Sequence, residues 1–208
     1  MARVPAAGRD PAGLSAQELS DRAAIVAVVV HWALWRDTGR WDKLRALYTV
    51  DAIQHTTWFV GPAREFIDRI AARPLGGSQH FVGACAVELN GDRAIAETRL
   101  MLLVRGALQQ TEVDVTCYTR SYDRLVRTAG AWRIQQREMI YEKDRLDPVD
   151  PLARITLDAA ALAQYPVGYR HLAYLQAAGG GRITPDLPVA GSEALKRLYA
   201  AGEQWLRG

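Results

Sequence analysis

The sequence predicts an α+β protein in which helices precede a group of antiparallel strands. Apolar residues recur at helical spacing in the first third of the chain, whereas from Gln79 onward they alternate with a period of two. The turn Asn90-Gly91-Asp92 separates two alternating runs, and Asn-Gly is the strongest short hairpin signal. Helices grouped before strands are typical of an α+β fold in which the helices pack on one face of a curved sheet.

The first helix is predicted to start at residue 16 and to stop at the Thr-Gly pair 38–39. Ser15 is a suitable N-cap, and Glu18, three residues later, completes the pattern of a capping box. Nearly every face of this helix is apolar between residues 23 and 35. We therefore expect the helix to be buried on most sides.

Three shorter elements and then four long strands follow. We expect a helix over residues 41–48, a strand over 52–59 and a helix over 62–72, where Pro62 suits the first turn. The period-two pattern and the turns between its runs predict four antiparallel strands, over residues 79–89, 93–105, 112–126 and 132–143.

The pattern divides the chain into three parts. Residues 1–14 are rich in Pro, Gly and Ala, and we expect a flexible tail there. Residues 15–147 form the α+β domain. Residues 148–208 form an extension with helical stretches over 152–165, 168–177 and 192–206. Because so short a segment buries little core alone, we expect it to pack on the domain as a candidate lid.

Composition excludes several classes of protein. The chain has 208 residues, of which 49% are hydrophobic and 24% charged, so it is not a disordered chain as a whole. The 26 Lys and Arg against 23 Asp and Glu give a net charge of only +3, and they form no basic run. Nucleic-acid binding is therefore not indicated. Six Trp and eight Tyr against three Phe is the unusual feature.

The cysteines and the apolar runs indicate a location. Cys85 and Cys117 lie in strand-like stretches without a CxxC or Cys/His cluster, which favours a reduced, cytoplasmic protein without a zinc site. The longest apolar run, residues 23–30, is far shorter than the roughly 20 residues of a membrane span. We therefore expect neither export nor membrane binding.

Asp37, at the end of the first helix, is the first candidate for chemistry. The negative end of the helix dipole and the apolar neighbours Ala33 and Val30 disfavour a carboxylate there, so we expect a raised pKa that makes Asp37 a usable base. The alternative is that Asp37 forms an ion pair with Arg36 or Arg40 at a solvated helix end.

His80, at the start of the first long strand, is the second candidate. If strict alternation holds, His80 shares a face with Val82, Ala84 and Ala86, which leave room beside the imidazole. A lone histidine is more often structural. An aspartate beside a histidine, however, supplies a general base near neutral pH, so Asp37 and His80 together favour catalysis.

Further candidates lie on the strands. Arg137 and Tyr141 share a face of the last strand, and an arginine on the apolar side of a sheet needs an anionic partner or a substrate oxygen. His55 and Trp58, in the short strand, could line the same cavity, although core packing is an equal alternative for Trp58. No phosphate-binding loop, GxSxG elbow or metal-ligand spacing is present.

The order of elements and several motifs resemble the SnoaL-like branch of the nuclear transport factor 2-like superfamily. The resemblance covers about residues 15–145 and depends on these stretches: Asp21-Arg-Ala-Ala-Ile25, Asp37-Thr-Gly-Arg-Trp-Asp42 with Leu44, Leu47, Tyr48 and Asp51-Ala52 after it, Gln79-His-Phe-Val-Gly83, and Gly130-Ala-Trp132. It implies a conical, curved sheet wrapped by the N-terminal helices. Within the superfamily the chain is most similar to the scytalone dehydratases and hexachlorocyclohexane dehydrochlorinases, which are cofactor-free lyases.

The resemblance also implies roles for residues. Asp37 matches the aspartate that orients the catalytic histidine, His80 the histidine that abstracts the proton, and Arg137 the arginine that steadies developing negative charge. His55 falls near a substrate-polarising tyrosine and Thr98 near a second catalytic histidine, so both depart from the dehydratase pattern. We assign Trp41, Trp58, Tyr141, His55 and Thr98 to substrate binding.

The sequence thus supports a cofactor-independent lyase in which His80, oriented by Asp37, removes a proton from a hydrophobic, aromatic small molecule. Dehydration, or a retro-aldol (deformylating) C–C cleavage of a lignin-type aromatic alcohol, would use this step. An isomerase or cyclase of the same fold, or a non-catalytic binding module, are the alternatives. We expect no cofactor and no metal. The resemblance implies a homodimer or homotrimer formed through the outer face of the sheet.

Overall fold

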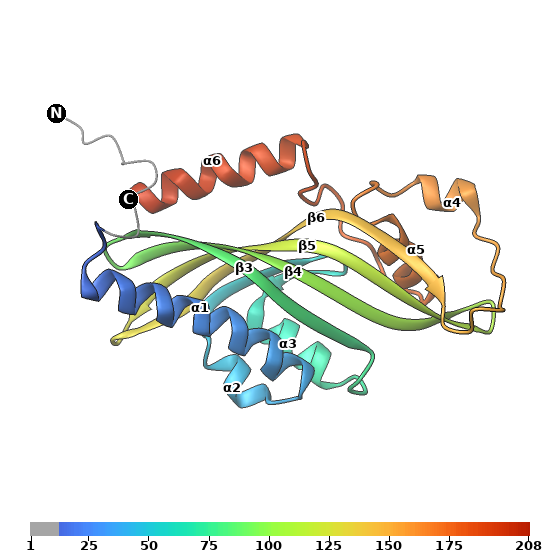
Figure 1. Cartoon of the computed structure of the whole chain (residues 1–208), viewed down its shortest axis with the longest axis horizontal. Coiled ribbons are helices and arrows are strands. Elements are labelled where there is room, and N and C mark those ends of the chain that lie inside the picture. The colour runs from blue at the N-terminus through green and yellow to red at the C-terminus, as the bar shows by residue number, and fades with distance from the viewer. Residues whose placement is uncertain (1–12) are drawn as a thin grey trace.

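The protein is built on one long, twisted six-stranded sheet. The computed structural model describes residues 13–208, so residues 1–12 of the expected tail lie outside the described residues. The strand order is β2-β1-β6-β5-β4-β3 (Figure 1). The strands are β1 (Tyr48–Thr56), β2 (Phe59–Pro62), β3 (Ser78–Asn90), β4 (Arg93–Leu108), β5 (Thr111–Thr128) and β6 (Ala131–Pro148).

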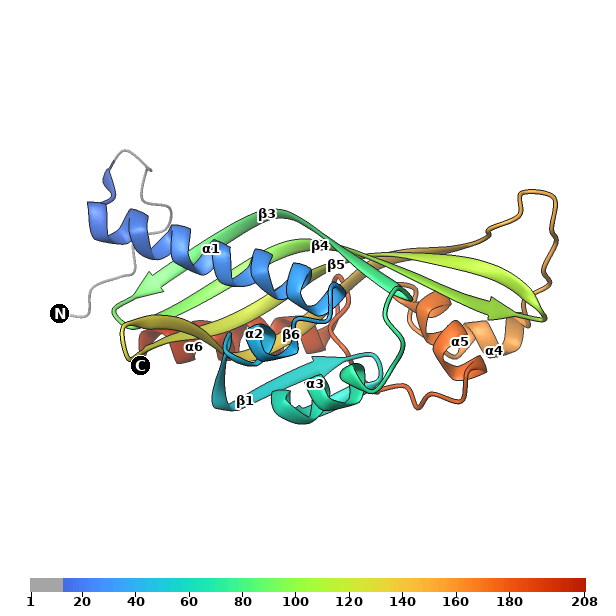
Figure 2. The same cartoon turned by 90° about the horizontal axis from the view of Figure 1, so that it is seen from below.

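Helices lie on both faces of this sheet. The helices are α1 (Ala16–Asp37), α2 (Trp41–Arg45), α3 (Ala63–Ala71), α4 (Ala159–Ala163), α5 (Arg170–Ala178) and α6 (Glu193–Arg207). Helices α1 to α3 lie on one face, which we call the inner face, whereas α6 lies across the opposite, outer face (Figures 1 and 2). The α+β class and the helical C-terminal segment are confirmed. None of the helices in residues 13–208 is long and apolar enough to cross a membrane.

The predicted capping box at the start of α1 is present. The Ser15 side chain accepts a hydrogen bond from the Glu18 backbone, and the Glu18 carboxylate accepts one from the Ser15 backbone. The expectation that α1 is buried on most sides is wrong. Its buried apolar residues, such as Ile25 and Trp32, form a single face toward the sheet, while Val30 and Leu34 are 42% and 52% exposed.

The region after α1 differs from the sequence prediction in its boundaries. Helix α2 ends at Arg45, and the next residues already lead into β1. The predicted strand 52–59 is in fact a hairpin, because Thr56 pairs with Phe59 and the chain reverses at Thr57 and Trp58. Pro62 is the N-cap of α3 and not a residue of its first turn. Strand β1 lies parallel to β6, and α3 packs against β1 and β2.

The four long strands are antiparallel neighbours, as predicted, and extend beyond their predicted ends. The hairpin between β3 and β4 closes at Asn90 and Arg93, with Gly91 at a positive φ of 59°. Strand β3 contains a β-bulge. Val82 pairs with Leu100 and Cys85 with Thr98, so two residues of β3, at 83 and 84, oppose one residue of β4.

The bulge overturns the expectation of strict alternation along β3. Before it, His80 and Val82 point to the inner face. After it, Cys85 and Val87 do so, and Ala84 and Ala86 are exposed. An extra residue in one strand shifts the side-chain period by one, so a single pattern cannot describe the whole strand.

The C-terminal segment packs on the sheet at two places. Helix α5 covers the inner face near the far ends of β4 to β6, where Leu172 and Leu175 join a buried cluster with Val113, Val115 and Cys117. Helix α6 covers the outer face through Leu195 and Leu198. Only residues 159–163 of the predicted helix 152–165 are helical, because Asp158 caps the backbone at Ala160 and Ala161 and starts the helix there.

Candidate functional site

The structure brings Asp37 and His80 together. Asp37 is the last residue of α1, and His80 is the third residue of β3, which runs beside that helix. The His80 Nδ1 atom lies 2.8 Å from Asp37 Oδ1, and the His80 backbone N–H donates to Asp37 Oδ2 at 2.6 Å. Both side chains are largely buried, at 6% and 14% exposure for His80 and Asp37. The carboxylate is thus held by two bonds to one residue.

This geometry fixes the tautomer of His80. An ionised carboxylate can only accept, so the hydrogen bond requires the proton on Nδ1 and leaves the lone pair on Nε2. The imidazole packs edge-on against the Trp32 indole, with ring centroids 5.3 Å apart. A base with its proton-accepting nitrogen defined by a buried carboxylate is the arrangement that general-base catalysis needs.

The electrostatics of the pair differ from the sequence expectation for Asp37. Burial opposes ionisation, but the hydrogen bonds from His80, its charge interaction with the carboxylate and the charge of Arg36 together lower the pKa of Asp37 below its usual value. The expected raised pKa is therefore wrong. Burial, and then the positive charge of Arg36, lower the pKa of His80 to about 4. At neutral pH the pair is thus an aspartate beside a neutral imidazole.

Arg36 also belongs to the site, although the sequence suggested it only as an ion-pair partner of Asp37. Its guanidinium lies 3.1 Å from Asp37 Oδ1, donates to Ser78 Oγ at 2.9 Å and lies 3.4 Å from His80 Nδ1. The ion pair with Asp37 and the Asp–His pair therefore coexist. Arg36 thus connects the end of α1 with the start of β3 and holds Asp37 and His80 close to each other.

Arg137 lies on the same inner face and is completely buried. Its Nε and Nη2 donate to both oxygens of Asp123, at 2.6 and 2.7 Å, and its guanidinium lies 4.1 Å from the centroid of the Trp32 ring. The anionic partner that an arginine on the apolar side of a sheet needs is thus Asp123, which was not among the predicted residues. The available signal was an aspartate, Asp123, at an alternating position of the neighbouring predicted strand, on the same face as Leu125. Trp32 touches both Arg137 and His80.

A short chain of hydrogen bonds continues from Trp32. The indole N–H donates to Tyr48 Oη at 2.5 Å, and the Tyr48 hydroxyl donates to Gln54 Oε1 at 2.7 Å. Gln54 is the register partner of Arg137 across β1 and β6. Gln54 Nε2 and Arg137 Nη1 are both buried donors without a hydrogen-bond partner in residues 13–208. Sequence reasoning missed Tyr48 and Gln54 as well.

A pocket of about 240 Å³ lies beside Asp37. Trp41 and Trp58, both assigned to substrate binding, line it, as do Leu102 and Val104 from β4. Residues 73–78, between α3 and β3, form another wall. The C-terminal segment contributes Gln176 from α5, so residues far apart in the sequence form the pocket together.

Five predicted residues do not line this pocket: His80 and Arg137, described above, and His55, Tyr141 and Thr98. His55 points to the outer face, where its Nδ1 lies 3.4 Å from Glu138 Oε2, because Gln54 is the inward residue of that stretch. Tyr141 is buried against Tyr169, and its hydroxyl accepts from the Thr57 backbone at 3.1 Å. Thr98 is fully buried and donates to Cys85 Sγ at 3.0 Å.

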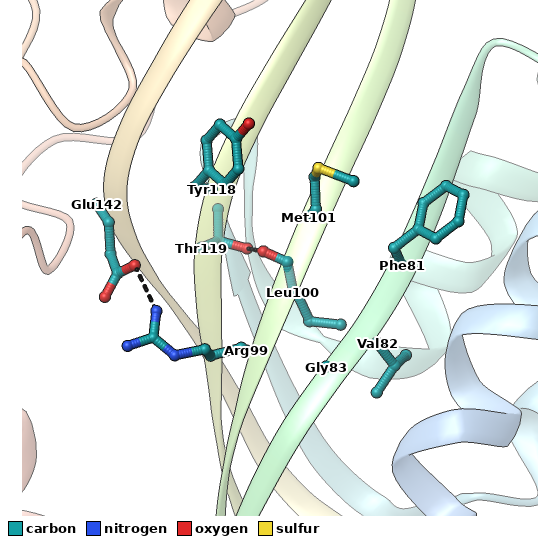
Figure 3. Close-up of a pocket in the computed structure, with 9 residues that line it drawn as sticks. All are labelled: Phe81, Val82, Gly83, Arg99, Leu100, Met101, Tyr118, Thr119 and Glu142. Atoms are coloured by element: carbon teal, nitrogen blue, oxygen red, sulfur yellow. Dashed lines mark hydrogen bonds and ion pairs between the residues drawn. The ribbon is translucent and has the colours of Figure 1, made fainter.

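A second pocket, of about 200 Å³, lies on the outer face of β3 to β5 (Figure 3). Phe81, Met101 and Tyr118 project from three neighbouring strands, and Arg99 forms an ion pair with Glu142 at 3.3 Å beside them. Alternation along β3 places Phe81 on the side opposite His80. This pocket is therefore separated from the Asp37–His80 pair by the sheet.

Residues 13–208 contain no group of three or more His, Cys, Asp or Glu side chains placed to hold a metal ion. Cys85 and Cys117 are free thiols. A second Asp–His pair occurs in the C-terminal segment, where Asp144 Oδ1 lies 2.8 Å from His171 Nδ1. Asp144 also accepts from the Leu172 backbone in the first turn of α5, so this pair anchors a helix to the sheet.

The curved six-stranded sheet with helices α1 to α3 on its inner face places the protein in the α+β class. The model of the SnoaL-like domain matches residues 17–138, more than half of the chain. The chain belongs to this family, within the nuclear transport factor 2-like superfamily.

Among relatives by sequence, two come from the fungus Fusarium vanettenii. The pea pathogenicity protein 2 is 28% identical over 192 residues, which cover 85% of this chain and 82% of that protein. A PEP2-like protein of the same organism is 28% identical over 190 residues, with the same coverage. Because these matches cover more of the chain than the family domain does, the similarity includes part of the C-terminal segment.

Solved structures share the fold of the domain. A candidate scytalone dehydratase from Novosphingobium aromaticivorans superposes with a TM-score of 0.52 at 16% identity, over 66% of this chain and 97% of that chain. A type 2 hexachlorocyclohexane dehydrochlorinase gives 0.52 at 17% identity, over 67% and 94%. At such identities the likeness concerns the fold. It confirms the expected resemblance of the domain to these two kinds of protein.

Proposed function

We propose that this chain is a cofactor-independent lyase that removes a proton from a hydrophobic, aromatic small molecule. The hydrogen-bonded pair of Asp37 and His80 carries this proposal, because it leaves His80 Nε2 as a defined, unprotonated base. The neighbouring pocket, with two tryptophans in its wall, supports the aromatic character of the substrate.

Each charged group has a proposed role. His80 Nε2 accepts the proton, and the Asp37 carboxylate stabilises the imidazolium that then forms. Arg137, which is fixed by Asp123 and Trp32, offers positive charge toward the negative charge that develops on the substrate or the leaving group. In a dehydration the departing hydroxide takes up the proton and leaves as water. In a retro-aldol reaction the proton comes from a hydroxyl group, the C–C bond breaks, an aldehyde is released, and the carbanion that remains takes the proton back from the His80 imidazolium.

The test is turnover by His80→Ala and Asp37→Asn with a panel of aromatic alcohols and diols, without added cofactor and with product identification by mass spectrometry. A product lighter by one water indicates dehydration, whereas formaldehyde indicates deformylating cleavage. An isomer of unchanged mass indicates an isomerase or cyclase. We expect both variants to lose activity, with His31→Ala, an exposed histidine on α1, as the active control.

The alternative from another class is a non-catalytic binding module. It is favoured if His80→Ala and the wild type bind an aromatic ligand equally and neither converts any member of the panel. Near-native turnover by His80→Ala would exclude the assignment of the base.

We also propose that the chain forms a homodimer or homotrimer through the outer face, where Phe81 is 57% and Tyr118 is 38% exposed. A monomeric mass in light scattering would refute this. The free thiols Cys85 and Cys117 support a proposed cytoplasmic location.

A further inference from the structure

The pocket beside Asp37 has two guanidinium groups in its wall. Arg36 comes from the end of α1 and Arg73 from the segment after α3, whereas Asp37 is the one carboxylate among the lining residues. Arg36 and the His80 backbone already occupy both oxygens of Asp37. The pocket therefore has an excess of positive charge.

Arg73 is the group that supplies this excess. Within residues 13–208 it has no carboxylate at ion-pair distance, and its guanidinium lies over the Trp58 ring, 4.3 Å from the centroid. Stacking on an indole holds the planar guanidinium in place and leaves the N–H groups at its edge free to donate. Those donors form a fork that matches the two oxygens of a carboxylate.

The two arginines also influence each other. Burial lowers the pKa of Arg36, the charge of Asp37 opposes this change, and the charge of Arg73 adds to it. Two like charges that face one pocket repel each other. An anion bound there would relieve the repulsion, and its binding would be stronger for that reason.

The rest of the wall suits an aromatic ring. Trp41 and Trp58 provide flat apolar surfaces, and Leu102 and Val104 provide aliphatic ones. A dry cavity of about 150 Å³ can hold benzene. The volume of about 240 Å³ is therefore enough for one ring with small substituents.

We propose that this pocket binds a single-ring aromatic carboxylate, with the carboxylate on Arg73 and the ring against the two tryptophans. The proposal rests on the proposed function in that it names the substrate class of the same site. It excludes neutral, purely apolar compounds as the best ligands of this pocket.

The test is calorimetric titration at pH 7 with 4-hydroxybenzoate and its neutral counterpart 4-hydroxybenzamide. We expect the carboxylate to bind about ten-fold more tightly, a difference that charge-assisted pairing readily supplies. Raising the salt concentration should reduce the preference for the carboxylate, since the Arg73 side chain is exposed. Equal dissociation constants for the two ligands would overturn the proposal.

Matched variants locate the effect. Arg73→Ala should abolish the preference for the carboxylate, and Arg73→Lys should retain only part of it because an ammonium lacks the fork. Arg69→Ala is the control, since Arg69 lies four residues earlier, packs over Phe59 near Glu65 and does not line the pocket. If Arg69→Ala loses the carboxylate preference to the same degree, or if Arg73→Ala keeps it, the assignment of Arg73 is contradicted.

Titrations of His80→Ala separate the two proposals. His80 does not line the pocket, so this variant should keep the carboxylate preference while it loses turnover. If His80→Ala loses turnover but the wild type binds 4-hydroxybenzoate and 4-hydroxybenzamide equally, His80 is the base and the proposed substrate class is wrong. If the wild type prefers 4-hydroxybenzoate but His80→Ala keeps full turnover, the substrate class is right and His80 is not the base.

Discussion

The low pKa of His80 makes the stability of the protein depend on pH in a defined direction. The imidazole is buried, and burial followed by the charge of Arg36 lowers its pKa from 6.5 to about 4. Between these two values the unfolded chain binds a proton that the folded chain does not. The free energy of unfolding is therefore highest above pH 6.5 and decreases as the pH falls toward 4.

The size of the effect follows from the two pKa values. One pKa unit corresponds to about 1.4 kcal/mol, so the single group should reduce the free energy of unfolding by about 2 kcal/mol between pH 7 and pH 5. Asp37 does not interfere in this range, because its lowered pKa places its titration below 3.8. The variant His80→Gln removes the titrating group and should lack this contribution.

Urea unfolding of wild type and His80→Gln at pH 7, 6 and 5, followed by tryptophan fluorescence, measures the contribution. We expect the free-energy difference between the two proteins to shift by about 2 kcal/mol in favour of the variant from pH 7 to pH 5. His31→Gln controls for the loss of an imidazole on the surface of α1.

A direct measurement complements the unfolding series. The histidine ring-proton signal that is missing in His80→Gln should titrate with a midpoint near 4 in the folded wild type. A midpoint at or above 6.5, or a free-energy difference that is the same at pH 7 and pH 5, would refute the argument that burial and Arg36 dominate over the attraction of Asp37.

Three further predictions concern other parts of the fold. Arg137→Ala leaves Asp123 buried without its partner and should cost about 3–5 kcal/mol of unfolding free energy, measurable in urea. Ser15→Ala removes the cap of α1 and should cost about 1 kcal/mol. Gly202→Ala places a methyl group 2.0 Å from the Tyr122 hydroxyl, so α6 should be displaced and the C-terminal segment cleaved faster by protease; an unchanged cleavage rate contradicts this.

The architecture was predictable because it depends on local patterns. The capping box at Ser15, the helix-to-strand order and the Asn90-Gly91 turn are all signals within a few residues. The predicted ends of elements were wrong where a contact with a distant residue determines the end. Tyr48 belongs to β1 and not to the predicted helix, because it pairs with Ile134, far along the chain. Local sequence cannot report such a partner.

The candidate site divides in the same way. Asp37 and His80 were predicted from the local setting of each residue, and the resemblance to the SnoaL-like family then implied their roles. Asp123 and Gln54 were missed because their roles arise only from pairing across strands, at Arg137 in both cases. The direction of the Asp37 pKa was wrong because the local environment of the helix end gave no account of the bonds from His80.

The β-bulge at residues 83 and 84 divides β3 into two segments with opposite side-chain phase. The first segment carries His80, and the second supplies Val87 to the hydrophobic core. Both residues can therefore point to the inner face although strict alternation would place them on opposite faces, since the bulge shifts the alternation by one residue between them. Deleting residue 84 would restore strict alternation: it would turn either His80 or Val87 toward solvent, and the protein would lose its base or part of its core.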